Sequence, residues 1–214
     1  MKKKQLKYVS LIAIAAISTS LLSFTNSATS VSKTNGYTVK SEIKDFKLEN
    51  VDGKKVSLAS YKDAKGYIIV FTCNHCPYSK AYETRILELD KKYASKGFPV
   101  IAISSNDQTA YPEDSFENMK KIAKEKSYTF PYLFDETQEV AKAFGAQKTP
   151  HVYVVNKKDK SMIVEYIGAI DNSPRDESNA SKLYVEDAVN ALLSGKSVPT
   201  TETKAIGCGI KWKS

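Results

Sequence analysis

The sequence has few of the residues that build metal clusters, nucleic-acid surfaces or disulfide scaffolds. Its 214 residues include three cysteines, two histidines and one tryptophan, and its only arginines are Arg85 and Arg175. Three cysteines are too few for a disulfide-rich scaffold. The net charge of +8 is concentrated at the N-terminus, since residues 29–214 carry 28 basic and 24 acidic residues. The remaining lysines lie among acidic residues, so we expect no nucleic acid as a partner.

The chain has no acidic residue before Glu42 and only one long apolar run, Tyr8–Phe24, which follows four lysines and precedes a polar stretch that ends at Ala28. This pattern predicts an export signal in residues 1–28, cleaved near Ala28. A run of 17 residues is at the short limit for crossing a bilayer of about 30 Å, so an uncleaved membrane anchor stays an alternative. Either way we expect a periplasmic or extracytoplasmic protein whose dithiols can stay oxidised.

The patterns after the signal predict one α/β domain over residues 40–198, followed by a C-terminal tail, 199–214. A hairpin is expected around the Asp52–Gly53 turn, and a helix that starts at Pro77 is expected to end at Gly97. Further strands are expected at 67–71, 100–104, 131–134, 151–156 and 162–167, and further helices after a capping box of Asp114 and Glu117, at 140–144 and at 185–192. Strands that alternate with helices before a final hairpin imply a mixed central sheet with helices on both faces.

A Cys-x-x-Cys motif carries the chemistry that we expect. Cys73 and Cys76 lie between a buried strand and the start of a helix. The unpaired N–H groups and positive dipole end at a helix start favour a thiolate, which lowers the pKa of a cysteine. We expect Cys73 to be the attacking sulfur and Cys76 to be the sulfur that closes the disulfide. This redox-active disulfide needs no other cofactor, and its partners are protein or small-molecule thiols and disulfides, with a redox partner protein.

The sequence resembles the thioredoxin-like superfamily, specifically its redoxin branch of alkyl-hydroperoxide-reductase and thiol-specific-antioxidant type. The resemblance rests on the hairpin 46–58, the strand before Cys73, the extra strand and helix at 100–127, the segment 130–135 and Thr149-Pro150 before a strand. It implies that Pro150 is a cis-proline facing the dithiol, and that the backbone of Thr149 binds an extended substrate. It also implies that His75 stabilises the Cys73 thiolate, as in the Cys-Pro-His-Cys sites of periplasmic disulfide oxidants, and makes the disulfide more oxidising.

Two other functions stay open. Thr72 and Cys76 also resemble the Thr-x-x-Cys of peroxiredoxins, which are thiol peroxidases with antioxidant activity, but Ile68 stands where those enzymes have proline. Neither arginine is placed by the sequence to polarise a peroxide. A copper chaperone of the Sco type is the alternative from the binding class, with Cys73, Cys76 and His151 as soft ligands for Cu(I).

Structural zinc is disfavoured, because a closed site needs four ligands and the motif supplies two. The third cysteine, Cys208, is flanked by Gly207 and Gly209 in the tail. An unpaired cysteine in an exported protein is notable, and an exposed tail with an inert thiol is the alternative to a functional one. We expect the tail to fold back towards the dithiol, where Cys208 is a possible resolving thiol that forms a disulfide with Cys73.

Overall fold

The computed structural model describes residues 36–214. The predicted signal, residues 1–28, lies outside the described residues, so its cleavage stays a prediction. Within residues 36–214, every helix is too short or too polar to cross a bilayer.

A seven-stranded mixed sheet forms the centre of the fold, with the strand order β2-β1-β5-β4-β3-β7-β8. β3 pairs in parallel with β4, and β4 with β5, whereas β7 runs antiparallel to both β3 and β8. The strands are β1 (Lys47–Asn50), β2 (Lys55–Ser57), β3 (Gly66–Phe71), β4 (Val100–Ser104), β5 (Tyr132–Phe134), β7 (His151–Lys158) and β8 (Ser161–Gly168). The predicted mixed sheet and N-terminal hairpin are confirmed.

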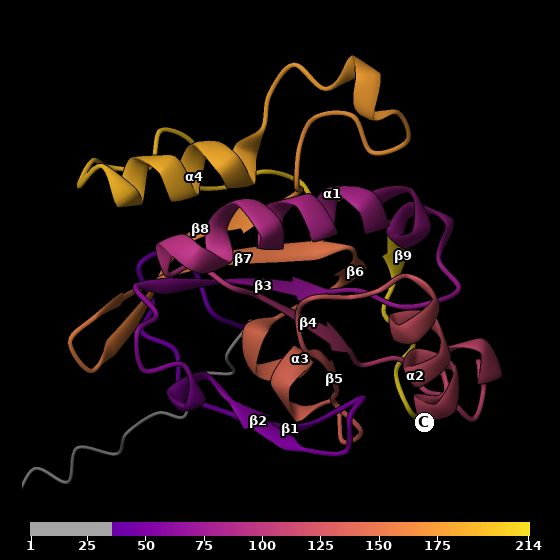
Figure 1. Ribbon diagram of the computed structural model, residues 1–214. Coiled ribbons are helices and arrows are strands. Elements are labelled where there is room, and N and C mark those ends of the chain that lie inside the picture. The colour runs from indigo at the N-terminus through magenta and orange to yellow at the C-terminus, as the bar shows by residue number, and fades with distance from the viewer. Residues whose placement is uncertain (1–35) are drawn as a thin grey trace, which may run out of the picture. The chain divides into compact units, whose positions relative to one another are not determined.

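Helices cover both faces of the sheet, because the buried residues of the central strands alternate between two apolar clusters. Ile68 and Val70 of β3 pack in the cluster that holds the apolar residues of α1 (Pro77–Tyr93), α2 (Phe116–Glu125) and α4 (Tyr184–Leu193). Ile69 and Phe71 pack in the second cluster, with α3 (Glu139–Phe144). Figure 1 shows α1 and α4 on one side of the sheet and α3 on the other.

The helix boundaries agree with the predicted start and stop residues at most places. Pro77 opens α1, and Gly97 ends the short 3-10 turn that follows it, with a φ of 95° that glycine adopts readily. The predicted capping box of α2 is wrong. Ser115, rather than Asp114, is the N-cap, and its side chain accepts from the N–H of Asn118 at 3.4 Å. Asp114 lies in the preceding 3-10 turn and is fully buried.

The tail folds onto the domain. Cys208–Gly209 forms β9, which pairs antiparallel with β6 (Lys148–Thr149) in a second, two-stranded sheet. Ile210, directly after β9, is buried in the same apolar cluster as α3. Figure 1 shows β9 beside β6, at the end of the sheet where β3 leads into α1. The predicted boundary at residue 199 therefore separates segments that pack together.

Candidate active site

The two cysteines of the motif lie between the end of β3 and the first turn of α1. Thr72 follows β3 and hydrogen-bonds to the strand β4 through its N–H, and Cys76 is the N-cap residue of α1. All three cysteines are free thiols. Cys73 is 4% exposed and Cys76 is fully buried, so the pair lies beneath the surface.

Thr149 contacts both sulfurs from the opposite side. Its hydroxyl Oγ1 is 3.3 Å from the Sγ of Cys73, and its carbonyl oxygen is 3.2 Å from the Sγ of Cys76. The peptide bond between Thr149 and Pro150 is cis. The backbone before Pro150 is therefore adjacent to the dithiol, which is the arrangement that the resemblance implied.

Cys76 is the sulfur that the surroundings favour as a thiolate. The Cys73 thiol, the Cys208 thiol and the backbone N–H of Ser79 in the first turn of α1 all face its sulfur, and these donors lower the pKa of Cys76 to about 4. The Cys73 thiol is the main cause of this low pKa, and the start of α1 contributes less.

Cys73 has the opposite electrostatics. The neighbouring Cys76 sulfur, burial and the Asp114 carboxylate all raise the pKa of Cys73. The expectation of a lowered pKa for Cys73 is therefore wrong, because these three effects outweigh the hydrogen bonds from Thr149 and from the Cys76 backbone that lower it. Which of the two sulfurs attacks a substrate first stays a prediction.

Asp114 organises the loop between the cysteines, and sequence reasoning missed this role. Its Oδ1 accepts from the backbone N–H groups of Asn74 and His75 at 2.8 and 3.0 Å. Its Oδ2 is 2.5 Å from Nδ1 of His75 and accepts from the amide of Asn106 at 2.7 Å. The imidazole of His75 also stacks on Tyr111, with ring centroids 5.2 Å apart. A contact across 39 residues leaves no periodic signal in a single sequence.

The potential ligands for a metal do not form the predicted copper set. Among the described residues, Cys73, His75 and Asp114 bring their ligand atoms within 4.8 Å of one another. His151 instead accepts from the N–H of Gln147 at 3.3 Å, and burial lowers its pKa to about 4. The oxygens of Asp114 already accept hydrogen bonds from two backbone N–H groups and one side-chain amide, which explains this cluster as a support for the loop.

Cys208 reaches the dithiol, but at the sulfur that the sequence did not predict. β9 places Cys208 opposite Thr149, and the thiol and backbone N–H of Cys208 face the sulfur of Cys76. Burial and the Cys76 sulfur raise the pKa of Cys208 to about 11, so it is a thiol that donates to Cys76. The sequence predicted that the tail folds back towards the dithiol, and the structure has this arrangement. The sequence placed Cys208 beside Cys73, whereas in the structure Cys208 lies beside Cys76.

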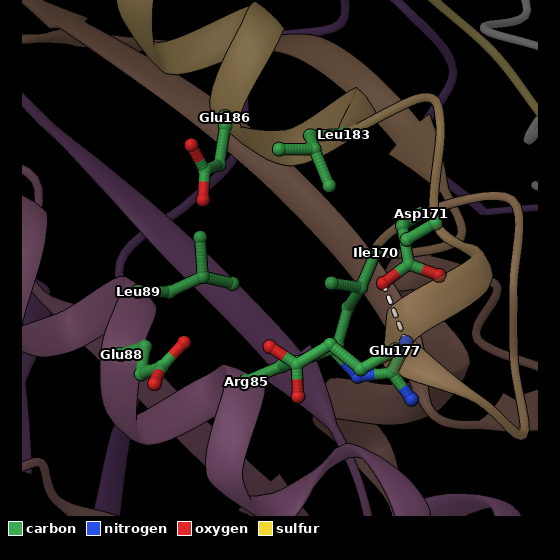
Figure 2. Close-up of a pocket in the computed structure, with 9 residues that line it drawn as sticks. Arg85, Glu88, Leu89, Ile170, Asp171, Glu177, Leu183 and Glu186 are labelled. Carbon is green, nitrogen blue, oxygen red and sulfur yellow. Dashed lines mark hydrogen bonds and ion pairs between the residues drawn. The ribbon is translucent and has the colours of Figure 1, made fainter.

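Neither arginine is arranged as a peroxide-binding residue. The guanidinium of Arg85 is buried and pairs with Asp171 at 2.6 Å. This pair lies at a pocket of about 250 Å³ that is lined also by Glu88, Glu177 and Glu186 (Figure 2). Arg175 donates to the hydroxyl of Tyr78 at 2.9 Å.

Comparison with known proteins gives the family. The model of the AhpC/TSA family matches residues 39–166. The chain belongs to the AhpC/TSA family. An uncharacterized conserved protein from Geobacillus kaustophilus, known from a crystal structure, is 42% identical to this AhpC/TSA protein, with a TM-score of 0.77 over 84% of this chain and 94% of that chain.

Two further similarities concern thiol chemistry. The thiol-disulfide oxidoreductase ResA of Geobacillus thermodenitrificans is 24% identical over 158 residues, which are 74% of this chain and 86% of ResA. A thiol:disulfide interchange protein of the thioredoxin family from Chlorobium tepidum is 25% identical, with a TM-score of 0.51 over 66% of this chain and 93% of that chain. This AhpC/TSA protein therefore has a thioredoxin-like fold and is an oxidoreductase.

Proposed function

We propose that the protein is an exported thiol-disulfide oxidoreductase whose Cys73–Cys76 pair alternates between dithiol and disulfide, with no other cofactor. The observation that carries the proposal is the contact of Thr149 with both sulfurs. The similarity to ResA, which is named for this activity, supports it. Export follows from the sequence pattern of residues 1–28.

The reaction uses both sulfurs and transfers two electrons from the dithiol to the substrate disulfide. Cys73 loses its proton and attacks one sulfur of a substrate disulfide, and the other substrate sulfur leaves as a thiolate that takes up a proton. Cys76 then attacks the Cys73 sulfur of this mixed disulfide, which releases the second substrate thiol and leaves a Cys73–Cys76 disulfide. The substrate disulfide is reduced by two electrons and the dithiol is oxidised by two. The Cys208 thiol, which also lowers the pKa of Cys76, remains beside this sulfur when Cys73 is part of the mixed disulfide.

Trapping with the two serine variants tests the division of roles. We expect Cys73→Ser to abolish turnover of insulin disulfides, and Cys76→Ser to accumulate a mixed disulfide on Cys73, detected by peptide mass mapping. If Cys76→Ser removes all reaction with disulfides while Cys73→Ser keeps it, Cys76 is the attacking sulfur.

A thiol peroxidase with Cys76 as the peroxidatic sulfur is the second candidate, because Cys76 is the favoured thiolate. The arginines argue against this candidate, because Arg85 pairs with Asp171 and Arg175 donates to Tyr78, so neither is arranged to bind a peroxide. Consumption of hydrogen peroxide by Cys73→Ser protein, measured beside the insulin assay, distinguishes the two candidates. The second candidate requires that consumption to persist, and the first requires it to be absent.

A further inference from the structure

The tail strand occupies the backbone edge where an extended substrate is expected to bind. β9 pairs with β6 so that Cys208 lies opposite Thr149 and Gly209 opposite Lys148. Thr149 is the residue before the cis-proline, and its hydroxyl and carbonyl both contact the dithiol. A segment of the chain itself therefore takes the place beside the sulfurs.

Hydrogen bonds beyond β9 fix this arrangement. The N–H of Ile210 donates to the carbonyl of Gln147 at 3.1 Å, and the Ile210 side chain is buried. The next residue, Lys211, donates its N–H to the side chain of Asn106 at 2.9 Å and accepts from the N–H of Asp107 at 2.8 Å. Gln147, Asn106 and Asp107 belong to the domain, so these hydrogen bonds hold the tail against the domain beside the dithiol.

The three sulfurs differ in their access to solvent. Cys73 is 4% exposed and Cys76 is fully buried, whereas Cys208 is half-buried. Cys208 lies opposite Thr149 in the β6–β9 pair, and the carbonyl of Thr149 accepts from the thiol of Cys76 at 3.2 Å, so Cys208 lies on the tail side of Cys76. Of the three cysteines, Cys208 is therefore the most exposed.

We infer that Cys208 is a third redox-active thiol, which moves the disulfide from the buried Cys73–Cys76 pair to the surface as a Cys76–Cys208 disulfide. The inference rests on the proposed function, because the Cys73–Cys76 disulfide is its starting point. The partner that meets Cys208 is a second thiol compound, distinct from the substrate disulfide that oxidised the pair.

The exchange balances without an added oxidant. Cys208 loses its proton and attacks the Cys76 sulfur, the Cys76–Cys208 bond forms, and Cys73 leaves as a thiolate that takes up a proton. An external thiolate then attacks the Cys208 sulfur, and Cys76 leaves as a thiolate. A second thiol of the partner attacks this mixed disulfide, which returns Cys208 to the thiol and leaves the partner as a disulfide. The low pKa of Cys76 makes it a good leaving group in the second step.

Disulfide mapping of the full chain tests the inference directly. Cys73→Ser protein, oxidised with diamide, should form an intramolecular Cys76–Cys208 disulfide, identified by peptide mass mapping under acid quench. Two free thiols, or only intermolecular dimers, would overturn the inference.

Two glycine variants in the Cys73→Ser background test the geometry. A Cβ at Gly207 would lie 2.2 Å from the carbonyl oxygen of Thr149, whereas a Cβ at Gly209 would meet its nearest atom at 4.0 Å. Gly207→Ala should therefore lower the yield of the Cys76–Cys208 disulfide at least about tenfold, because a backbone contact must give way. Gly209→Ala is the matched control and should leave the yield unchanged. Equal yields in the two variants contradict the inferred geometry.

A rate measurement keeps the inference testable if a glycine variant fails to fold. The oxidised wild-type and Cys208→Ser proteins are reduced with dithiothreitol and followed by mass. Cys208→Ser should react at least about tenfold more slowly, because the tail must open before the buried pair is reached. Equal rates overturn the inference and leave the proposed function intact. Failure of Cys208→Ser protein to form any Cys73–Cys76 disulfide contradicts the proposed function instead.

Discussion

At the residue scale, one buried carboxylate sets the position of the histidine beside the dithiol. Asp114 binds both the backbone N–H and the imidazole of His75, so it fixes the loop and the ring together. Removing one partner of such a buried group leaves the other unsatisfied, which costs about 1–3 kcal/mol. The position of His75 therefore depends on a residue that lies 39 positions away in the sequence.

The imidazole of His75 should make the disulfide more oxidising, because a donor beside the dithiol stabilises its reduced form. His75→Phe removes the imidazole nitrogens and keeps both the N–H that Asp114 accepts and a ring that can stack on Tyr111. We expect its redox potential to be more negative by about 30 mV or more, a tenfold change in the equilibrium. Titration in glutathione buffers measures this shift, and an unchanged potential removes His75 from the redox chemistry.

His151 should make stability depend on pH. Burial lowers its pKa to about 4, whereas an unfolded histidine titrates near about 6.5. Between these values the unfolded chain binds a proton that the folded chain does not, so stability is full above about pH 6.5 and falls as the pH drops towards 4. His151→Asn should reduce this loss by on the order of 2 kcal/mol. Urea unfolding at pH 7 and pH 4.5 measures it, and an equal loss in both proteins contradicts the assignment.

At the element scale, the long strands and helices were predictable because their patterns are local. The apolar run 67–71 marked β3, and Pro77 and Gly97 marked the limits of α1 and its final turn. β6 and β9 have two residues each, which is too short for any periodic pattern. The cap of α2 was misassigned because Asp114 and Ser115 are both good N-cap residues, and only the buried partners of Asp114 decide between them.

Because Ile210 anchors β9, we expect a substitution at Ile210 to release the tail while the rest of the domain stays folded. Ile210 is 6% exposed, follows β9 directly and packs in the apolar cluster of α3. Ile210→Ala should release the tail at a cost of about 2–3 kcal/mol, because the buried side chain loses its packing. Trp212, the single tryptophan of the chain, lies two residues further on and reports the release by a change in fluorescence. Trp212 fluorescence identical to wild type in a folded variant contradicts this role.

At the scale of the whole molecule, the redoxin resemblance correctly predicted the family and the thioredoxin-like fold. The sequence also brought Cys73, Cys76 and Thr149 to one place, since the motif and Thr149-Pro150 flank strands that pair. It did not predict which sulfur the helix favours or which sulfur Cys208 faces. Those features depend on distances between side chains from separate elements, and no pattern within one element encodes them.

A redox titration of the wild-type, Cys73→Ser, Cys76→Ser and Cys208→Ser proteins, with each disulfide identified by mass mapping, tests the proposed dithiol chemistry. We expect a two-electron transition through the Cys73–Cys76 disulfide in the wild-type and Cys208→Ser proteins, and we expect no such disulfide in the other two. A protein that never forms a Cys73–Cys76 disulfide in any buffer, while it remains folded, would contradict the central claim.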